Sequence, residues 1–197
     1  CNIFDVLDSL NSVFEKQAEQ KGLTYQCTTK IELPYVYCDQ IKFEEILLNV
    51  VGNSVKYTKN GNISIHVEEV ESGHFQCIIQ DTGIGMSEEF LPSLFEAFAR
   101  ERNTTAGKVA GTGLGMPIIK KYVDMMGGSI EAESKLGEGS KFTVIMESRI
   151  ADKGYYEQVT DPSPDTEETD RISGKYVLLA EDNDLNAEIA EFILEDM

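Results

Sequence analysis

The order of hydrophobic patterns along the first 150 residues constrains the fold of this chain more than any other feature. Apolar residues recur at helical spacing in residues 3–14, 41–55 and 118–126. Strand-like runs occupy residues 23–31, 63–70, 75–80, 129–134 and 141–147. The last four runs form two hairpin-like pairs joined by short turns. This order predicts an α+β fold, a two-layer α/β sandwich with a mixed, mostly antiparallel sheet and its helices on one face.

Capping and turn residues predict where several elements begin and end. Gly22 ends the first helix. Ser87, which two glutamates follow, predicts the cap of a further helix behind it. Residues 35–38 are a candidate short strand. Residues 100–115 are polar and glycine-rich, which predicts a mobile loop.

The chain is acidic, but its charge is uneven. The formal net charge is −18. Residues 1–150 carry 14 basic and 21 acidic side chains, whereas residues 151–197 carry 3 and 14. Because the phosphate backbone of a nucleic acid repels such a chain, we expect no nucleic-acid partner. An anionic ligand must therefore be held by local groups.

Composition also predicts the domain organisation. Residues 151–173 contain two prolines and many acidic side chains, a composition that buries too little apolar surface to order itself. We therefore expect one domain at residues 1–150, an acidic flexible linker at 151–173 and the truncated start of an α/β domain at 174–197. This last segment opens with an apolar strand-like run.

The cysteines and the hydropathy bear on the compartment. Four cysteines without C-x-x-C spacing indicate free thiols in a reducing cytoplasm. No apolar run approaches the roughly 20 residues that a membrane span needs. We expect a cytoplasmic fragment without direct membrane contact. If the parent protein is anchored in an inner membrane, the anchor lies outside this piece.

One side of the second predicted helix is polar. Asn49, Asn53, Lys56 and Tyr57 stand at offsets of 4, 7 and 8, which place them on one helical stripe. An amide oxygen is a neutral ligand that suits Mg²⁺, and an ammonium group suits a phosphate oxygen. The alternative interpretation is a polar helix face in water.

Two further segments carry glycines that let a ligand approach the backbone. The segment Asp81-Thr82-Gly83-Ile84-Gly85-Met86 follows a predicted strand, so its carboxylate could accept a hydrogen bond from an amine such as adenine N6. The alternative is a plain turn. The segment Gly111-Thr112-Gly113-Leu114-Gly115 precedes a predicted helix, whose N-terminus attracts phosphate. No Walker sequence occurs, and a dinucleotide-binding fingerprint fits poorly because a polar loop precedes Gly111.

A fourth segment lies between these two. Phe95 and Phe98 stand three residues apart, which is typical of core side chains, and the planar guanidinium of Arg100 could reach a phosphate. In this order, and within 70 residues, the four segments resemble the N, G1, F and G2 boxes of histidine kinases. The resemblance covers roughly residues 3–148. It implies the Bergerat-type fold of the gyrase, heat-shock chaperone, histidine-kinase and mismatch-repair ATPases, which hold ATP and Mg²⁺ under a flexible lid.

The resemblance also implies a role for each motif residue. Asn53 would ligate Mg²⁺, and Asn49, Lys56 and Tyr57 would contact the nucleotide and its phosphates. Asp81 would bind adenine N6 in a pocket shaped by Gly83, Gly85 and Met86. The residues that would close over the triphosphate are Gly111, Thr112, Gly113, Leu114 and Gly115. Residues 99–110, with Arg100 and Lys108, would form the lid. The candidate catalytic residues are Asn53, Lys56 and Arg100.

One position separates the members of this superfamily. Members that hydrolyse ATP usually carry a Glu one helical turn before the metal-binding Asn. Asn49 stands there, and an amide cannot act as a general base. The resemblance therefore implies the ATP-binding catalytic domain of a hybrid two-component sensor histidine kinase. Its acceptor histidine would lie on a dimerisation domain before Cys1, because neither His66 nor His74 has a helical acidic context.

The last residues of the sequence predict a second partner for the kinase domain. Residues 177–183 resemble the first strand and acidic pocket of receiver domains, so a receiver domain or response regulator is expected beside the histidine-bearing domain. Two alternatives stay open. One is an anti-sigma-type serine kinase of the same superfamily, against which the receiver-like segment argues. The other is a non-catalytic nucleotide-binding module, against which the intact motifs argue.

Overall fold

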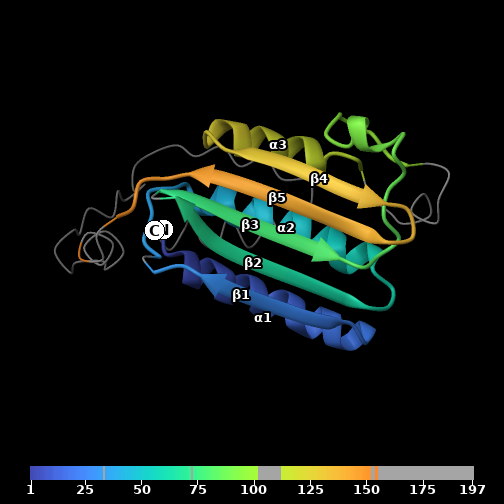
Figure 1. Cartoon of the computed structure of the whole chain (residues 1–197), viewed down its shortest axis with the longest axis horizontal. Coiled ribbons are helices and arrows are strands. Elements are labelled where there is room, and N and C mark those ends of the chain that lie inside the picture. The colour runs from blue at the N-terminus through green and yellow to red at the C-terminus, as the bar shows by residue number, and fades with distance from the viewer. Residues whose placement is uncertain (33, 72, 102–111, 152–153, 155–197) are drawn as a thin grey trace, which may run out of the picture. The chain divides into compact units, whose positions relative to one another are not determined.

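The computed structural model describes residues 1–32, 34–71, 73–101, 112–151 and 154, and within them five strands form one mixed sheet (Figure 1). The strands are β1 (Thr24–Lys30), β2 (Asn62–Glu71), β3 (His74–Asp81), β4 (Ser129–Lys135) and β5 (Gly139–Glu147). Their order in the sheet is β1-β2-β3-β5-β4. β1 pairs with β2 in parallel, and the other three pairings are antiparallel. The predicted mixed, mostly antiparallel sheet is confirmed.

Three α-helices lie over one face of this sheet in the described part of the chain (Figure 1). They are α1 (Ile3–Lys21), α2 (Gln40–Tyr57) and α3 (Gly115–Met125). The predicted stop at Gly22 is confirmed, since this residue has φ +69° and its N–H bonds the last carbonyls of α1. Asp39 caps α2 by accepting a hydrogen bond from the backbone N–H of Lys42 at 3.1 Å.

The core lies between the helices and the sheet. Five α2 side chains are 0% exposed, namely Phe43, Ile46, Leu47, Val50 and Val51. In β3 the buried positions alternate, so that Phe75, Cys77 and Ile79 face the helices. Asp81 continues the same alternation and is buried as well. The strand period therefore brings this carboxylate to the helix-covered face of the sheet.

One predicted helix is wrong. Behind Ser87 the chain forms only a short 3₁₀ turn, η1 (Leu91–Ser93). Ser87 does accept a hydrogen bond from the N–H of Phe90, at 3.3 Å, as its predicted capping role requires. The chain then turns away because Phe98 has φ +64° and its N–H donates to Gly113 at 3.0 Å. A tertiary hydrogen bond replaces the helical one, and Phe98 is 72% exposed rather than part of the core.

Other predictions have mixed outcomes. Residues 35–38 form no strand, because Tyr35 and Val36 make only isolated bridges, to Asn2 and Ile150. Most of the predicted loop, residues 102–111, lies outside the described residues, as do most of the predicted linker and all of the second domain. The four cysteines are free. No helix that the structure describes is both long and apolar enough to cross a membrane.

Candidate functional site

A cavity of about 290 Å³ opens where α2, the end of β3 and the first turn of α3 meet. Eleven of the predicted site residues line it, namely Asn49, Asn53, Lys56, Tyr57, Asp81, Gly85, Met86, Arg100, Thr112, Gly113 and Gly115. Gly83 and Leu114 are not part of the lining. Lys108 and Gly111 lie outside the described residues. Four segments that are separate in the sequence thus converge on one space.

Asp81 is held from two sides at the inner end of the cavity. Its Oδ1 accepts a hydrogen bond from the N–H of Gly83 at 2.8 Å, and its Oδ2 accepts one from the Ser54 hydroxyl at 3.0 Å. Burial raises the pKa of the Asp81 carboxyl above its ordinary value, and hydrogen bonds from Gly83, Ser54 and Ser140 oppose this rise. A carboxylate has about four acceptor sites, so Asp81 can still accept a hydrogen bond from a ligand.

Two close approaches explain the glycines beside this carboxylate. A Cβ on Gly83 would lie 2.8 Å from Asp81 Oδ1 and 2.8 Å from the Tyr57 carbonyl oxygen. Gly85 has φ +65°, and a Cβ there would lie 2.0 Å from the Lys135 carbonyl oxygen. Gly83 therefore shapes the surroundings of Asp81 without lining the cavity.

A buried hydroxyl, that of Thr58, lies close to Gly83 and Asp81. Thr58 is 0% exposed, and its Oγ1 has no hydrogen-bond partner in the structure as described. A Cβ on Gly83 would lie 2.9 Å from this oxygen. Buried polar atoms are nearly always hydrogen-bonded, so this oxygen is an unsatisfied polar group close to Asp81 among the described residues.

The polar stripe of α2 forms a second wall of the cavity. Asn49 donates its Nδ2 proton to the backbone carbonyl of Glu45 at 2.9 Å, and Asn53 donates to Met116 Sδ at 3.5 Å. Within the described residues, neither amide oxygen has a hydrogen-bond donor. The Lys56 ammonium lies 5.2 Å from the ring centroid of Tyr57. The stripe therefore presents two amide oxygens and a cation.

The first turn of α3 closes the cavity on the third side. A Cβ on Gly115 would lie 2.9 Å from Asn49 Oδ1, so a glycine lets α3 approach α2. Gly113, at φ +73°, accepts the hydrogen bond from Phe98. Leu114, the residue before α3, makes no side-chain capping bond. In the part of the chain that the structure describes, the side chain of Leu114 therefore caps none of the first N–H groups of α3.

Sequence reasoning missed several lining residues. The polar or sulfur-bearing ones are Ser54, Glu101, Met116 and Ser140. Glu101 accepts a hydrogen bond from the N–H of Ser87 at 3.2 Å. Ser54 and Met116 directly follow motif residues, which was the available signal, but their bonds join segments far apart in the chain.

The donor set can be compared with the needs of a metal ion. Among the residues that the structure describes, no group of three or more His, Cys, Asp or Glu side chains could hold a metal. Mg²⁺ usually keeps several waters and binds through one or two protein oxygens plus substrate phosphates. The free amide oxygen of Asn53 fits a cation that arrives with phosphates.

Comparisons with known proteins agree with this geometry. The family model described as "Histidine kinase-, DNA gyrase B-, and HSP90-like ATPase" matches residues 38–150. The chain is 34% identical over 192 residues to the autoinducer 2 sensor kinase/phosphatase LuxQ of Vibrio vulnificus strain YJ016, covering 94% of this chain and 22% of that protein. It is 31% identical over 193 residues to the aerobic respiration control sensor protein ArcB of Escherichia coli K12, covering 97% and 24%. The chain thus spans less than a quarter of the length of these relatives.

Solved structures show the same fold. Full-length ShkA in complex with AMPPNP superposes with a TM-score of 0.68 at 26% identity, over 77% of this chain and 31% of that one. The nucleotide-free catalytic domain of the histidine kinase ThkA gives 0.64 at 25% identity, over 76% and 94%. The family model covers more than half of the chain, and the fold agrees with it. The chain therefore contains an ATP-binding domain of the histidine kinase type and belongs to the histidine kinase-, DNA gyrase B- and HSP90-like ATPase family.

Proposed function

We propose that this chain is the catalytic domain of a hybrid two-component sensor kinase, which transfers the γ-phosphoryl group of ATP to a histidine on a dimerisation domain outside this piece. The observation that supports this most is the convergence of a buried carboxylate, Asp81, and two asparagine amides, Asn49 and Asn53, on one cavity. A group that would bind the base and a group that would bind the metal thus line the same space.

The base end would select adenine. Asp81, held by Gly83 and Ser54, would accept a hydrogen bond from the exocyclic N6 amine. Guanine carries a carbonyl oxygen at the corresponding position, and an ionised carboxylate repels it. In a buried site this mismatch leaves a charge unpaired, which costs more than an exposed mismatch would.

The other groups would hold the triphosphate. Asn53 would ligate Mg²⁺, and the groups that would contact phosphate oxygens are Asn49, Lys56, Arg100, Thr112 and the backbone from Gly113 to Gly115. Bound Mg²⁺ would neutralise charge on the phosphates during transfer. These side chains would align the terminal phosphoryl group with its acceptor, which is most of what phosphoryl transfer requires.

The residue at the general-base position favours a protein acceptor over water. Two carboxylates line the described part of the cavity, and both are engaged, Asp81 with Gly83 and Ser54, and Glu101 with Ser87. Asn49 stands where hydrolysing relatives carry their general base. Because an amide at that position cannot activate water, transfer to an aligned protein group fits the site better.

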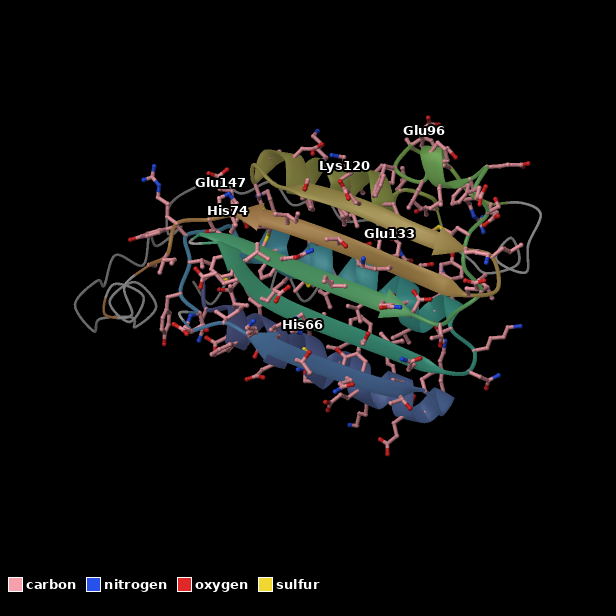
Figure 2. The ribbon with its side chains drawn as sticks, viewed as in Figure 1. His66, His74, Glu96, Lys120, Glu133 and Glu147 are labelled. Carbon is pink, nitrogen blue, oxygen red and sulfur yellow. The ribbon has the colours of Figure 1, made fainter. Side chains whose placement is uncertain are left out.

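The acceptor would come from outside the described residues. His66 lies on β2, and its Nδ1 is 2.9 Å from Thr28 Oγ1 (Figure 2). His74 is the first residue of β3, whereas Asp81 is the last residue of that strand. Neither histidine lines the cavity. A histidine-bearing dimerisation domain of the same protein would supply the acceptor.

The remaining segments complete the proposal. Residues 1–150 would be the catalytic domain, 151–173 a flexible linker and 174–197 the start of a receiver domain, the next phosphoryl acceptor. The similarity to LuxQ and ArcB extends over 94% and 97% of this chain, and so beyond residue 150, which supports this division. The domain would act in the cytoplasm, where ATP is available.

A transfer assay tests the proposal. The chain is mixed with radiolabelled ATP, Mg²⁺ and the histidine-bearing dimerisation domain of ArcB or LuxQ. We expect an acid-labile, base-stable phosphate on that domain, and none with Asn53→Ala. An acid-stable phosphate on serine would support the serine-kinase alternative. ATP binding without transfer to this domain or to that of the parent protein would indicate a non-catalytic module.

A further inference from the structure

The Asn53 side chain meets an unusual hydrogen-bond acceptor. Its Nδ2 group lies 3.5 Å from the thioether sulfur of Met116, 63 positions further along the chain. Both residues line the cavity, Asn53 from α2 and Met116 from the first turn of α3. A thioether is a weak acceptor and cannot donate, so it distinguishes the two ends of an amide.

The side-chain amide of Asn49 has the same orientation as that of Asn53, but a different acceptor holds it. Asn49 donates its Nδ2 proton to the Glu45 carbonyl oxygen, within its own helix. Each amide thus uses an NH₂ proton on a protein acceptor and keeps its oxygen for a ligand. For Asn49 the backbone of α2 enforces this orientation, whereas for Asn53 the acceptor comes from α3.

The orientation of the Asn53 amide matters because its two possible orientations fill nearly the same space. A rotation of 180° exchanges the oxygen and the NH₂ group with little change in volume. An NH₂ group toward the cavity would repel a cation, whereas an oxygen attracts it. The sulfur of Met116 favours the second arrangement before any ligand binds.

We propose that Met116 is a positioning residue for the metal-binding amide, since its thioether accepts the Nδ2 proton of Asn53 and leaves Oδ1 open to Mg²⁺-ATP. This inference rests on the proposed function of the cavity. It assigns to the first turn of α3 a task besides its backbone N–H groups, namely control of an α2 side chain.

The test replaces the sulfur without changing the size of the side chain. Met116→Leu keeps a similar volume and removes the acceptor. Met126→Leu is the matched control, because Met126 is a partly buried methionine at the other end of α3 and does not line the cavity. AMPPNP is titrated calorimetrically into each protein with Mg²⁺ and with EDTA, and the ratio of the two dissociation constants is compared.

We expect Met116→Leu to reduce the gain in affinity due to Mg²⁺ about threefold, the size of one weak hydrogen bond, and to leave binding in EDTA unchanged. Met126→Leu should match the wild type, and Asn53→Ala should lose the gain altogether. In ¹⁵N–¹H spectra of the ligand-free protein, the side-chain NH₂ signals of Asn53, identified by their absence in Asn53→Ala, should shift in Met116→Leu alone.

Three results would overturn the inference while leaving the proposed function intact, two from calorimetry and one from the spectra. One is a wild-type Mg²⁺ gain in Met116→Leu. The second is an equal loss of affinity with and without Mg²⁺, which would indicate a packing role only. The third is unshifted Asn53 NH₂ signals, which would contradict the contact. If the wild type binds no AMPPNP at all, the proposed function itself fails, and the inference fails with it.

Discussion

The two ends of the cavity are built on different principles. At the base end, Asp81 is 6% exposed and both of its oxygens already accept hydrogen bonds, from Gly83 and Ser54. At the phosphate end, Asn49 and Lys56 are only partly buried and Arg100 is exposed to water. Buried, hydrogen-bonded groups keep one geometry in the absence of a ligand, whereas exposed charges are screened and gain little until a ligand excludes water. On the proposed assignment, base recognition would therefore be prearranged, as would the amide of Asn53, whereas the charged contacts with phosphate would strengthen only when the ligand and its metal bind.

Asp81→Asn should break the base end and have the largest effect. The amide presents an NH₂ group where the carboxylate presents an oxygen, so the contact with an exocyclic amine is lost. We expect AMPPNP affinity to fall about 30- to 100-fold, equivalent to about 2–3 kcal/mol for a hydrogen bond to a charged group. Calorimetry measures the loss. A change of less than threefold would contradict the assignment of Asp81 to the base.

The same variant should be more stable without a ligand. Because the pKa of the Asp81 carboxyl is raised in the fold, the folded state holds this proton more tightly than the unfolded state. Stability then falls as the pH rises from the ordinary pKa of aspartate through the raised value. The asparagine cannot ionise, so the thermal midpoint of Asp81→Asn should exceed that of the wild type at pH 7, and the two should converge in acid.

Gly83→Ala should distort the base end with a smaller effect. Its Cβ would lie 2.8 Å from both Asp81 Oδ1 and the Tyr57 carbonyl oxygen. We expect about 1–3 kcal/mol of destabilisation and about a tenfold loss of AMPPNP affinity. Gly52→Ala is the matched control, because its Cβ would meet Phe14 at an ordinary 3.6 Å inside α2. That control should raise stability by about 0.5–1 kcal/mol and leave affinity unchanged.

Lys56→Met should weaken the phosphate end alone. The variant keeps the aliphatic stem of the side chain and removes its charge. We expect AMPPNP affinity to fall about fivefold and to depend less on salt concentration than in the wild type. The affinity for adenosine should not change. Asp81→Asn should weaken adenosine and AMPPNP alike, so titrations with both ligands separate the two ends. If Lys56→Met lost affinity for adenosine and AMPPNP equally, the distinction between a base end and a phosphate end would be wrong.

Ser54→Ala should have the smallest effect and act through Asp81. Removing the hydroxyl takes away a donor that stabilises the ionised carboxylate, at a cost of about 0.5–1.5 kcal/mol. The pKa of Asp81 should rise further, so the loss of affinity on acidification should begin at a higher pH than in the wild type. At pH 8 we expect about a threefold loss. If the affinity of Ser54→Ala begins to fall at the same pH as that of the wild type, Ser54 does not stabilise the charge of Asp81.

Much of the fold could be predicted because it depends on local periodicity. The alternation of β3 placed Phe75, Cys77 and Ile79 on one face, and the helical spacing of α2 separated its apolar side from Asn49 and Asn53. The predicted 87–98 helix is replaced by a 3₁₀ turn at Leu91–Ser93, and the N–H of Phe98 donates to Gly113, a partner that the capping signal at Ser87 does not report. Local patterns cannot report a partner that is distant in sequence.

The sequence by itself determined the architecture, the family and the residues that could contact a nucleotide, because periodicity and motif order are properties of neighbouring residues. Only the tertiary structure decided which atoms of those residues are already engaged. Ser54 holds Asp81 from 27 positions away, and Met116 contacts Asn53 from 63 positions away. Hydrogen bonds depend on distances of a few tenths of an ångström, which packing sets and spacing along the chain does not.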